Sequence, residues 1–272
     1  MVFPNYISTE PLPIHPLLQS FISHYVYRNF IISPEAVLEK KMPLRHVNSI
    51  DFFLGDPFDT EDCLTGEAHA FVRSTIRGPR TFTKYRIQLR RHFISFTVKF
   101  HPAGLYRLLQ MPMKLFTDQA IDSSCIDQLP FREITERLFY AADAAACVSI
   151  IESYLLPIAL QRSSSPAITD MIARNLIERK RIGPMTSIAD TYHISLRQLE
   201  RNFLREIGVV PKTYARMVRF EQLLQSRINK PLYKWAALAH DSNYHDQMHL
   251  VKEFRNFLDI TPSSFQKDDF AF

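Results

Sequence analysis

The hydrophobic period of this chain changes at about Ala103, and a short polar stretch that ends in proline, at 162–166, then divides the chain into two parts. Before it, segments with alternating apolar and polar residues are followed by segments with helical spacing. Alternation lines one face of a strand, whereas spacing of three or four residues lines one face of a helix. After the polar stretch Arg162–Pro166, all apolar spacing is helical. With 272 residues available, each part can bury its own core. We predict a domain over 1–162, a linker over 163–166 and a helical domain over 167–268.

The first part predicts an α+β unit, with a small β-sheet or barrel followed by about three helices. Strands with one buried face are predicted at 50–54, 85–89 and 94–100. The basic segment Arg90–His92 between two of them predicts a hairpin connection or a sheet edge. Helices are predicted from the apolar spacing of 105–109, 134–141 and 148–156.

The second part predicts seven helices from apolar spacing and from capping residues. Ser195, with Gln198 three residues later, predicts the start of the third helix, and Gly208 its end. Pro211 opens a long fourth helix that runs to about Leu224. The other predicted features are a first helix over 168–176, a second capped by Thr186-Ser187, a fifth over 235–239, a sixth capped by Asp246 and a seventh opened by Thr261-Pro262.

Composition excludes several classes of protein. Glycine occurs only 6 times, and no Gly-rich phosphate loop is present. The three cysteines, Cys63, Cys125 and Cys147, are widely spaced, which disfavours a disulfide framework or a cysteine zinc site and fits a reducing compartment. The sequence has no pattern typical of a signal peptide and no apolar run of membrane-spanning length. We therefore expect a cytoplasmic protein with no membrane partner.

Positive charge is concentrated in the second part. The chain carries a net charge of +5, but residues 1–165 hold 17 basic and 16 acidic side chains. Residues 166–267 hold 16 basic and 10 acidic side chains. An excess of this size is compatible with nucleic-acid binding without requiring it.

Two pairs of predicted helices have the proportions of helix-turn-helix units. The first pair is 187–192 with 195–205, and the second is 234–240 with 246–257. In such a unit the second helix packs one apolar stripe inward and presents another face to the major groove.

The second helix of the first pair carries three arginines on one face. Leu196, Leu199 and Phe203 form its inward stripe, and Arg197, Arg201 and Arg205 follow each other at intervals of four residues. Like charges at this spacing repel one another unless negative charge lies opposite, and DNA phosphates supply such charge. A solvated face neutralised by Glu200 and Glu206 explains the same pattern, and the sequence leaves both interpretations open.

The second helix of the second pair has an equally distinct outer face. Its inward stripe is Leu250, Phe254 and Phe257. The outer residues are Gln247, Met248, His249, Lys252 and Arg255. Glutamine can pair with adenine, and methionine can contact the thymine methyl group.

These units resemble the AraC/XylS-type DNA-binding domain over about residues 168–267. The resemblance is carried by segments 194–203, 208–216, 235–239, 244–255 and 261–265. It implies two units in one chain, joined by a linker helix of roughly 15 residues, or about 22 Å, that read successive major-groove segments of double-stranded DNA. The base-reading residues it implies are Arg197, Glu200, Arg201, Gln247, Met248, His249 and Lys252. The phosphate-contacting residues are Ser195, Arg205, Lys212 and Arg255. It implies neither catalytic residues nor a cofactor.

The sequence departs from the family at both interhelical turns. Where members often have glycine, this chain has His193 and Asn243. Asparagine adopts the left-handed conformation more readily than histidine. We expect both turns to form, with somewhat lower stability.

The first domain resembles the N-terminal domain of one AraC subgroup, at residues 98–109 and 50–53. Such domains usually sense a small molecule or dimerise. The resemblance therefore adds a small-molecule effector of the N-terminal domain and a second copy of the chain as candidate partners. RNA polymerase is a further candidate partner of a transcription regulator.

Two interpretations from other classes remain as alternatives. His245 and His249, with Asp246 between them and His240 nearby, have a spacing that can hold zinc, but no motif supplies a third ligand, so no metal is predicted. The first domain could instead be a ligand-binding protein or a cupin-like metalloenzyme with an architectural helical domain. Its histidines are scattered, so we predict no enzyme. Strand alternation explains the basic segment 84–92, and Trp235 is most simply a core residue.

Overall fold

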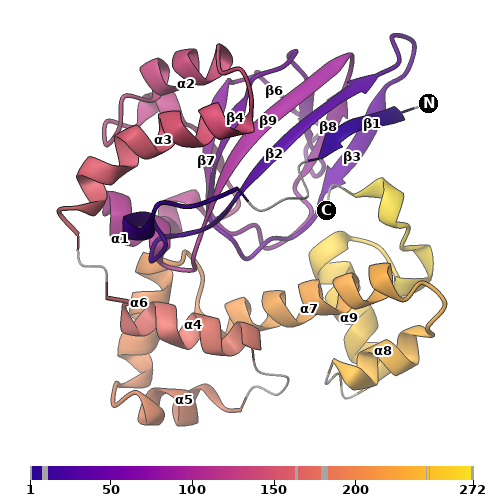
Figure 1. The fold of residues 1–272 in the computed structure, drawn as a ribbon. Helices are drawn as coiled ribbons and strands as arrows, with labels where there is room; N and C mark the ends of the chain where they lie inside the picture. Colours follow the sequence, from indigo (N-terminus) through magenta and orange to yellow (C-terminus); the bar gives the residue numbers. More distant parts are fainter. Residues whose placement is uncertain are drawn as a thin grey trace.

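The computed structural model describes residues 2–7, 12–162, 165–178, 183–242, 244 and 246–270. Two β-sheets form the first domain, with helices against one of them, and the helical domain lies beneath the sheets (Figure 1). The predicted fold class, an α+β domain followed by an all-α domain, is confirmed.

The larger sheet has six strands, all antiparallel to their neighbours, in the order β1-β2-β9-β4-β7-β10. Their bounds are Val2–Ile7 (β1), Ile22–Ile32 (β2), His92–Phe100 (β9), Ser49–Phe53 (β4), Ser74–Arg77 (β7) and Ala120–Asp122 (β10). At its centre β4 pairs with β9 in a register that sets Ser49 beside Lys99 and Asp51 beside Thr97. This register brings the polar side chains of both strands to the same face.

The smaller sheet has the order β3-β8-β5-β6. Its strands are Leu38–Met42 (β3), Tyr85–Leu89 (β8), Asp59–Asp62 (β5) and Ala68–His69 (β6). The predicted strand at 85–89 is therefore correct, but the hairpin considered at Arg90–His92 is wrong, because β8 and β9 belong to different sheets. The chain crosses between the sheets at Arg91, whose φ is 55°.

Both faces of the larger sheet are covered, whereas alternation predicted a single buried face. On one face Ile50, Phe52, Phe96 and Val98 share a core with the helices α1 (Gly104–Leu109), α2 (Phe131–Phe139) and α3 (Ala144–Ala159). On the other face Asp51, Ser95 and Thr97 are also buried, and they line a cavity. The polar residues of these alternating strands therefore face an internal cavity. The sequence alone could not show whether they face a cavity or solvent.

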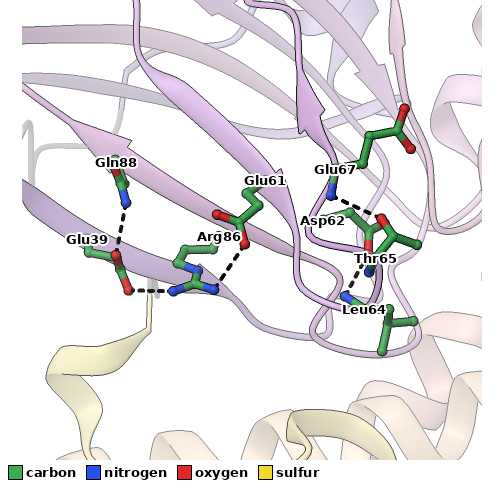
Figure 2. Close-up of polar contacts among 8 residues, drawn as sticks. All are labelled: Glu39, Glu61, Asp62, Leu64, Thr65, Glu67, Arg86 and Gln88. Atoms are coloured by element: carbon green, nitrogen blue, oxygen red, sulfur yellow. Dashed lines mark hydrogen bonds and ion pairs between the residues drawn. The ribbon is translucent and has the colours of Figure 1, made fainter.

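On the outer side of the smaller sheet, Arg86 of the basic segment 84–92 pairs with two acids. Arg86 of β8 lies 3.3 Å from Glu39 of β3 and 3.2 Å from Glu61 of β5, and Gln88 donates to Glu39 at 3.1 Å (Figure 2). Ile87 and Leu89 point into the cavity instead. The alternation expected for this strand is confirmed, and exposed ion pairs of this kind stabilise by about 0–1 kcal/mol.

The helical domain contains six α-helices among the described residues. They are Ile168–Glu178 (α4), Met185–Thr191 (α5), Leu196–Glu206 (α6), Pro211–Asn229 (α7), Trp235–Asp241 (α8) and Gln247–Leu258 (α9). Three details differ from the sequence prediction. The cap of α5 is Pro184 rather than Thr186-Ser187, α7 continues five residues past Leu224, and the predicted seventh helix is one 3-10 turn, Pro262–Ser264. Both α5 and the last turn begin at a proline. Proline holds φ near the helical value, and it lacks the backbone N–H that would have no partner at a helix start.

The two domains are joined by buried contacts rather than by a free linker. Arg107 of α1 pairs with the fully buried Asp170 of α4 at 3.2 Å and donates to the Ser165 carbonyl at 2.9 Å. The Thr83 N–H donates to the Phe257 carbonyl at 2.8 Å. Ser163 and Ser164 of the predicted linker lie outside the described residues. Ser165, by contrast, belongs to the interface.

Candidate DNA-binding surface

The first helix-turn-helix unit consists of α5 and α6. Ser195 caps α6, and its Oγ accepts a hydrogen bond from the Gln198 N–H at 3.1 Å. His193, in the turn, has a φ of 53°. Histidine therefore adopts the left-handed conformation at the position where family members often have glycine. Leu199 and Phe203 are fully buried, which fixes the helix against the core, but Leu196, predicted in the same inward stripe, is 37% exposed.

The outward face of α6 carries exposed charge. Arg197, Glu200 and Arg201 are exposed, and within the described residues none of the three forms an ion pair. Two cations four residues apart, with no acid paired to either, leave a positive face. Glu200 lies on the same face, so the assignment of these arginines to DNA stays a prediction.

Arg205 differs from the other two arginines. Its Nη2 donates to Glu206 at 2.6 Å, and its guanidinium lies 5.4 Å from the ring centre of Tyr106 in α1. In this arrangement Arg205 ties α6 to the first domain. Its assignment to a DNA phosphate stays a prediction.

The second unit consists of α8 and α9. Asp246 caps α9 and accepts from the His249 N–H at 2.7 Å. Gln247, Lys252 and Arg255 are exposed, and Met248 is 75% exposed, which is unusual for a large apolar side chain. The second turn residue, Asn243, and His245 lie outside the described residues.

His249 and Lys212 occupy different settings. His249 is half-buried, with its ring 5.2 Å from that of Tyr244, so only part of it faces outward. Lys212 is exposed in the first turn of α7, beside the end of α6. The proposed base-reading residues other than His249 are exposed, and the helices that carry them, α6 and α9, lie at opposite ends of α7 (Figure 1).

Sequence reasoning missed the residue that holds α9 on α7. Glu253 is 2% exposed and accepts from Arg216 at 3.0 Å through Nε and at 2.7 Å through Nη2, with Arg219 at 3.7 Å. A signal was available, since Glu253 falls three residues after Leu250, within the inward stripe of α9. An acid at a core position requires a buried partner.

The core of the second unit is aromatic. The Trp235 ring lies 4.9 Å from that of Phe254 and 5.8 Å from that of Phe265. Phe220 of α7 lies 4.9 Å from Phe254. Trp235 thus packs against the core of the second unit, as predicted, but its side chain is only partly buried.

The described residues offer little for other chemistry. No group of three or more His, Cys, Asp or Glu side chains among them could share a metal ion. Cys63, Cys125 and Cys147 are all free thiols. No helix in the described part of the chain is long and apolar enough to cross a membrane.

Comparison with known proteins agrees with this geometry. Residues 188–268 match a family described as a helix-turn-helix domain, and residues 11–122 match a domain of unknown function (DUF6597). No curated protein matches the chain. The first match covers most of the first unit, all of α7 and the second unit, and it supports a DNA-binding transcriptional regulator. This match agrees with the AraC/XylS-type resemblance of residues 168–267.

Solved structures of similar proteins include ToxT from Vibrio cholerae. One ToxT structure, at 1.65 Å resolution, is 8% identical, with a TM-score of 0.47 over 88% of this chain and 96% of that one. ToxT bound to an unsaturated fatty acid is 11% identical, with a TM-score of 0.45 over 89% and 94%. The AraC-like transcriptional activator CuxR is 16% identical, with a TM-score of 0.25 over 74% and 76%. All these scores are below 0.5, so the assignment rests on the helix-turn-helix match.

Proposed function

We propose that α6 and α9 read two successive major-groove segments on one face of duplex DNA. The observation that carries this proposal is the exposed, unpaired charge of Arg197 and Arg201 on the outer face of a capped recognition helix. Arginine can bind the O6 and N7 atoms of guanine with both arms of its guanidinium, and Arg201 is suited to such a contact.

The contacts divide into two kinds. Base contacts are assigned to Arg197, Glu200 and Arg201 of α6, and to Gln247, Met248, His249 and Lys252 of α9. Phosphate contacts are assigned to Ser195, Arg205, Lys212 and Arg255. The 19 residues of α7 span about 28 Å, longer than the sequence predicted. With the widths of the flanking helices added, this length suits the roughly 34 Å of one DNA turn.

The first domain is proposed to modulate this binding. It contacts the first unit through Tyr106 and Thr117, and the second through Thr83. An effector or a second copy of the chain that shifts the first domain would therefore alter both units. RNA polymerase is the further partner proposed for a regulator bound beside a promoter, and the cytoplasm is the compartment proposed.

Selection of random duplex DNA on the full-length protein, at about 150 mM salt, tests the proposal. At that salt concentration non-specific binding is weak. We expect an enriched motif of two short blocks about 10 base pairs apart. Arg201→Ala should relax one block and Gln247→Ala the other. Arg132→Ala, an exposed cation of the first domain, should change neither. A single block would contradict the two-helix mechanism, and enrichment unaffected by either variant would contradict the assigned surface.

A further inference from the structure

A cavity of about 510 Å³ lies between the two sheets of the first domain. It is lined by residues of β2, β3, β4, β7, β8 and β9, and on one side by Glu221, Leu224 and Gln225 of α7. Cavities that hold small molecules in proteins have about this size. The helix that joins the two DNA-binding units thus forms part of its wall.

The lining of this cavity carries a large excess of positive charge. Six basic side chains line it and only two acidic ones; the basic residues are Arg28, Lys40, Arg45, Arg77, Arg80 and Lys99. The acids, Asp51 and Glu221, already have partners. Asp51 accepts from Thr97 at 2.7 Å and lies 3.5 Å from Arg77. Both oxygens of Glu221 are engaged by His46, at 2.7 and 2.9 Å.

Three of the six cations have partners within the protein. Arg77 lies beside Asp51, Arg80 donates to the Pro43 carbonyl at 2.6 Å, and Lys40 donates to the Asp268 carbonyl. For the side chains of the other three, Arg28, Arg45 and Lys99, the described residues provide no hydrogen bond and no ion pair. An uncompensated charge that is half-buried is costly, so its retention calls for a counter-charge.

The pKa values of three of these basic side chains are lowered, as expected where positive charges outnumber negative ones. Burial, followed by the nearby charges of Arg45 and Arg28, lowers the pKa of Lys99 to about 8. Burial and the charge of Arg45 also lower the pKa of Arg80 to about 9. The pKa of Arg28 is lowered for the same two reasons. An anion placed among these side chains would reverse the shifts.

The wall at one end of the cavity is apolar and largely aromatic, because Phe30 and Phe93 pair with each other on β2 and β9, and Lys99 lies further along β9. This wall consists of Phe30, Phe53, Phe58, Ile87, Leu89 and Phe93. The Phe53 ring lies 4.9 Å from that of Phe58. A molecule that fills the cavity would therefore meet cations at one end and rings at the other.

We infer that this cavity binds a small organic anion, with its acidic group among Arg28, Arg45 and Lys99 and its apolar body against the aromatic wall. The inference names the ligand class of the first domain. Its link to DNA binding rests on the proposed function, because the ligand would act through the α7 residues in the cavity wall.

Calorimetric titration of the full-length protein, without DNA, tests the ligand class. The probes are 4-phenylbutyrate, 4-phenylbutyl phosphate, 4-phenylbutanol and 4-phenylbutylammonium, which share one body and differ in the head group. We expect one equivalent of at least one anion to bind, at least tenfold more tightly than the alcohol and the ammonium compound. The two anions distinguish a carboxylate site from a phosphate site. Equal binding of the alcohol, or no binding of either anion at millimolar concentration, would overturn the inference.

Substitution of one cation locates the site. Lys99→Met keeps the length of the side chain, and we expect it to weaken the preferred anion at least tenfold while leaving the alcohol unchanged. Arg132→Met, outside the cavity, is the matched control. Should Lys99→Met fail to fold, Arg45→Met provides the same comparison. Anion binding that neither variant weakens would place the ligand elsewhere.

A separate DNA titration with and without the preferred anion tests the link to regulation. We expect DNA affinity to change at least threefold at saturating anion. Anion binding with no change in DNA affinity would contradict the regulatory link while leaving the ligand site intact. Loss of DNA selection without any anion would contradict the proposed function instead.

Discussion

The two helix-turn-helix units share one design but are anchored differently. Each has a capped second helix, and each buries one acid, Glu206 in α6 and Glu253 in α9. Glu206 pairs with Arg205, its own neighbour, whose guanidinium lies over Tyr106 of the first domain. Glu253 pairs with Arg216 of α7. The buried acid of the first unit is thus linked to the first domain, whereas that of the second unit is linked to the connecting helix.

Removal of the two buried acids should give the largest difference between the units. Glu253→Ala leaves Arg216 and Arg219 facing an uncompensated buried site, and we expect a loss of about 3–5 kcal/mol in the free energy of unfolding. Glu206→Ala should cost about 1 kcal/mol, because the Arg205 side chain is 48% exposed and can return to water.

Urea denaturation of the full chain measures both values. Glu200→Ala, at an exposed position of α6, is the control and should stay within about 0.5 kcal/mol of the parent. Equal losses for Glu206→Ala and Glu253→Ala would show that the two anchors do not differ in strength.

Local features of these units could be predicted from the sequence, whereas contacts between distant segments could not. The caps Ser195 and Asp246 form the predicted bonds, because a cap and its partner are three residues apart. The pairing of Glu253 with Arg216 joins residues on two helices. The sequence shows an acid within the apolar stripe of α9, but it does not show which residue pairs with that acid. The same holds for the first domain. Strands 85–89 and 94–100 were predicted, but their separation into two sheets depends on the twist and crossing of the whole chain.

The cavity illustrates the same limit. Lys99 occupies a polar position of an alternating strand, and such a position normally faces water. Its burial follows from the second sheet, whose strands come from residues 38–42 and 59–89. The exposed recognition faces were easier to predict, since the stripe of each helix is set by its own residues.

The base contacts of the two units should be comparable in strength but independent in sequence preference. Arg201→Ala and Gln247→Ala are each expected to cost about 1–3 kcal/mol on the preferred site. Each should relax discrimination in its own block alone, because contacts this far apart add independently.

Competition binding against sites with single base changes provides the measurement. The double variant serves as the internal control and should lose the sum of the two single effects. A Gln247→Ala protein that discriminates like the parent would remove α9 from base recognition and leave α6 as the reading helix.

The smallest effect is expected at Lys212, between the units. A phosphate contact carries no sequence information, so Lys212→Ala should weaken all DNA sequences alike. It should also flatten the dependence of log affinity on log salt by about one charge. Fluorescence anisotropy at several salt concentrations measures the slope, with Arg132→Ala as the control. A sequence-dependent loss would instead make Lys212 a base-reading residue.

The close packing around Gly208 limits which sensor domains can be joined to this DNA-binding domain. It ends α6 with a φ of 111°, and a β-carbon there would lie 2.9 Å from both Pro79 and Thr117 of the first domain. Together with the Arg107–Asp170 pair, this close packing makes the surfaces of the two domains complementary to each other. A chimera that joins this DNA-binding domain to another sensor would have to bring the matching surface with it. In a genetic screen, substitutions that abolish promoter recognition should accordingly appear at Arg107 and Thr117, far in sequence from either recognition helix.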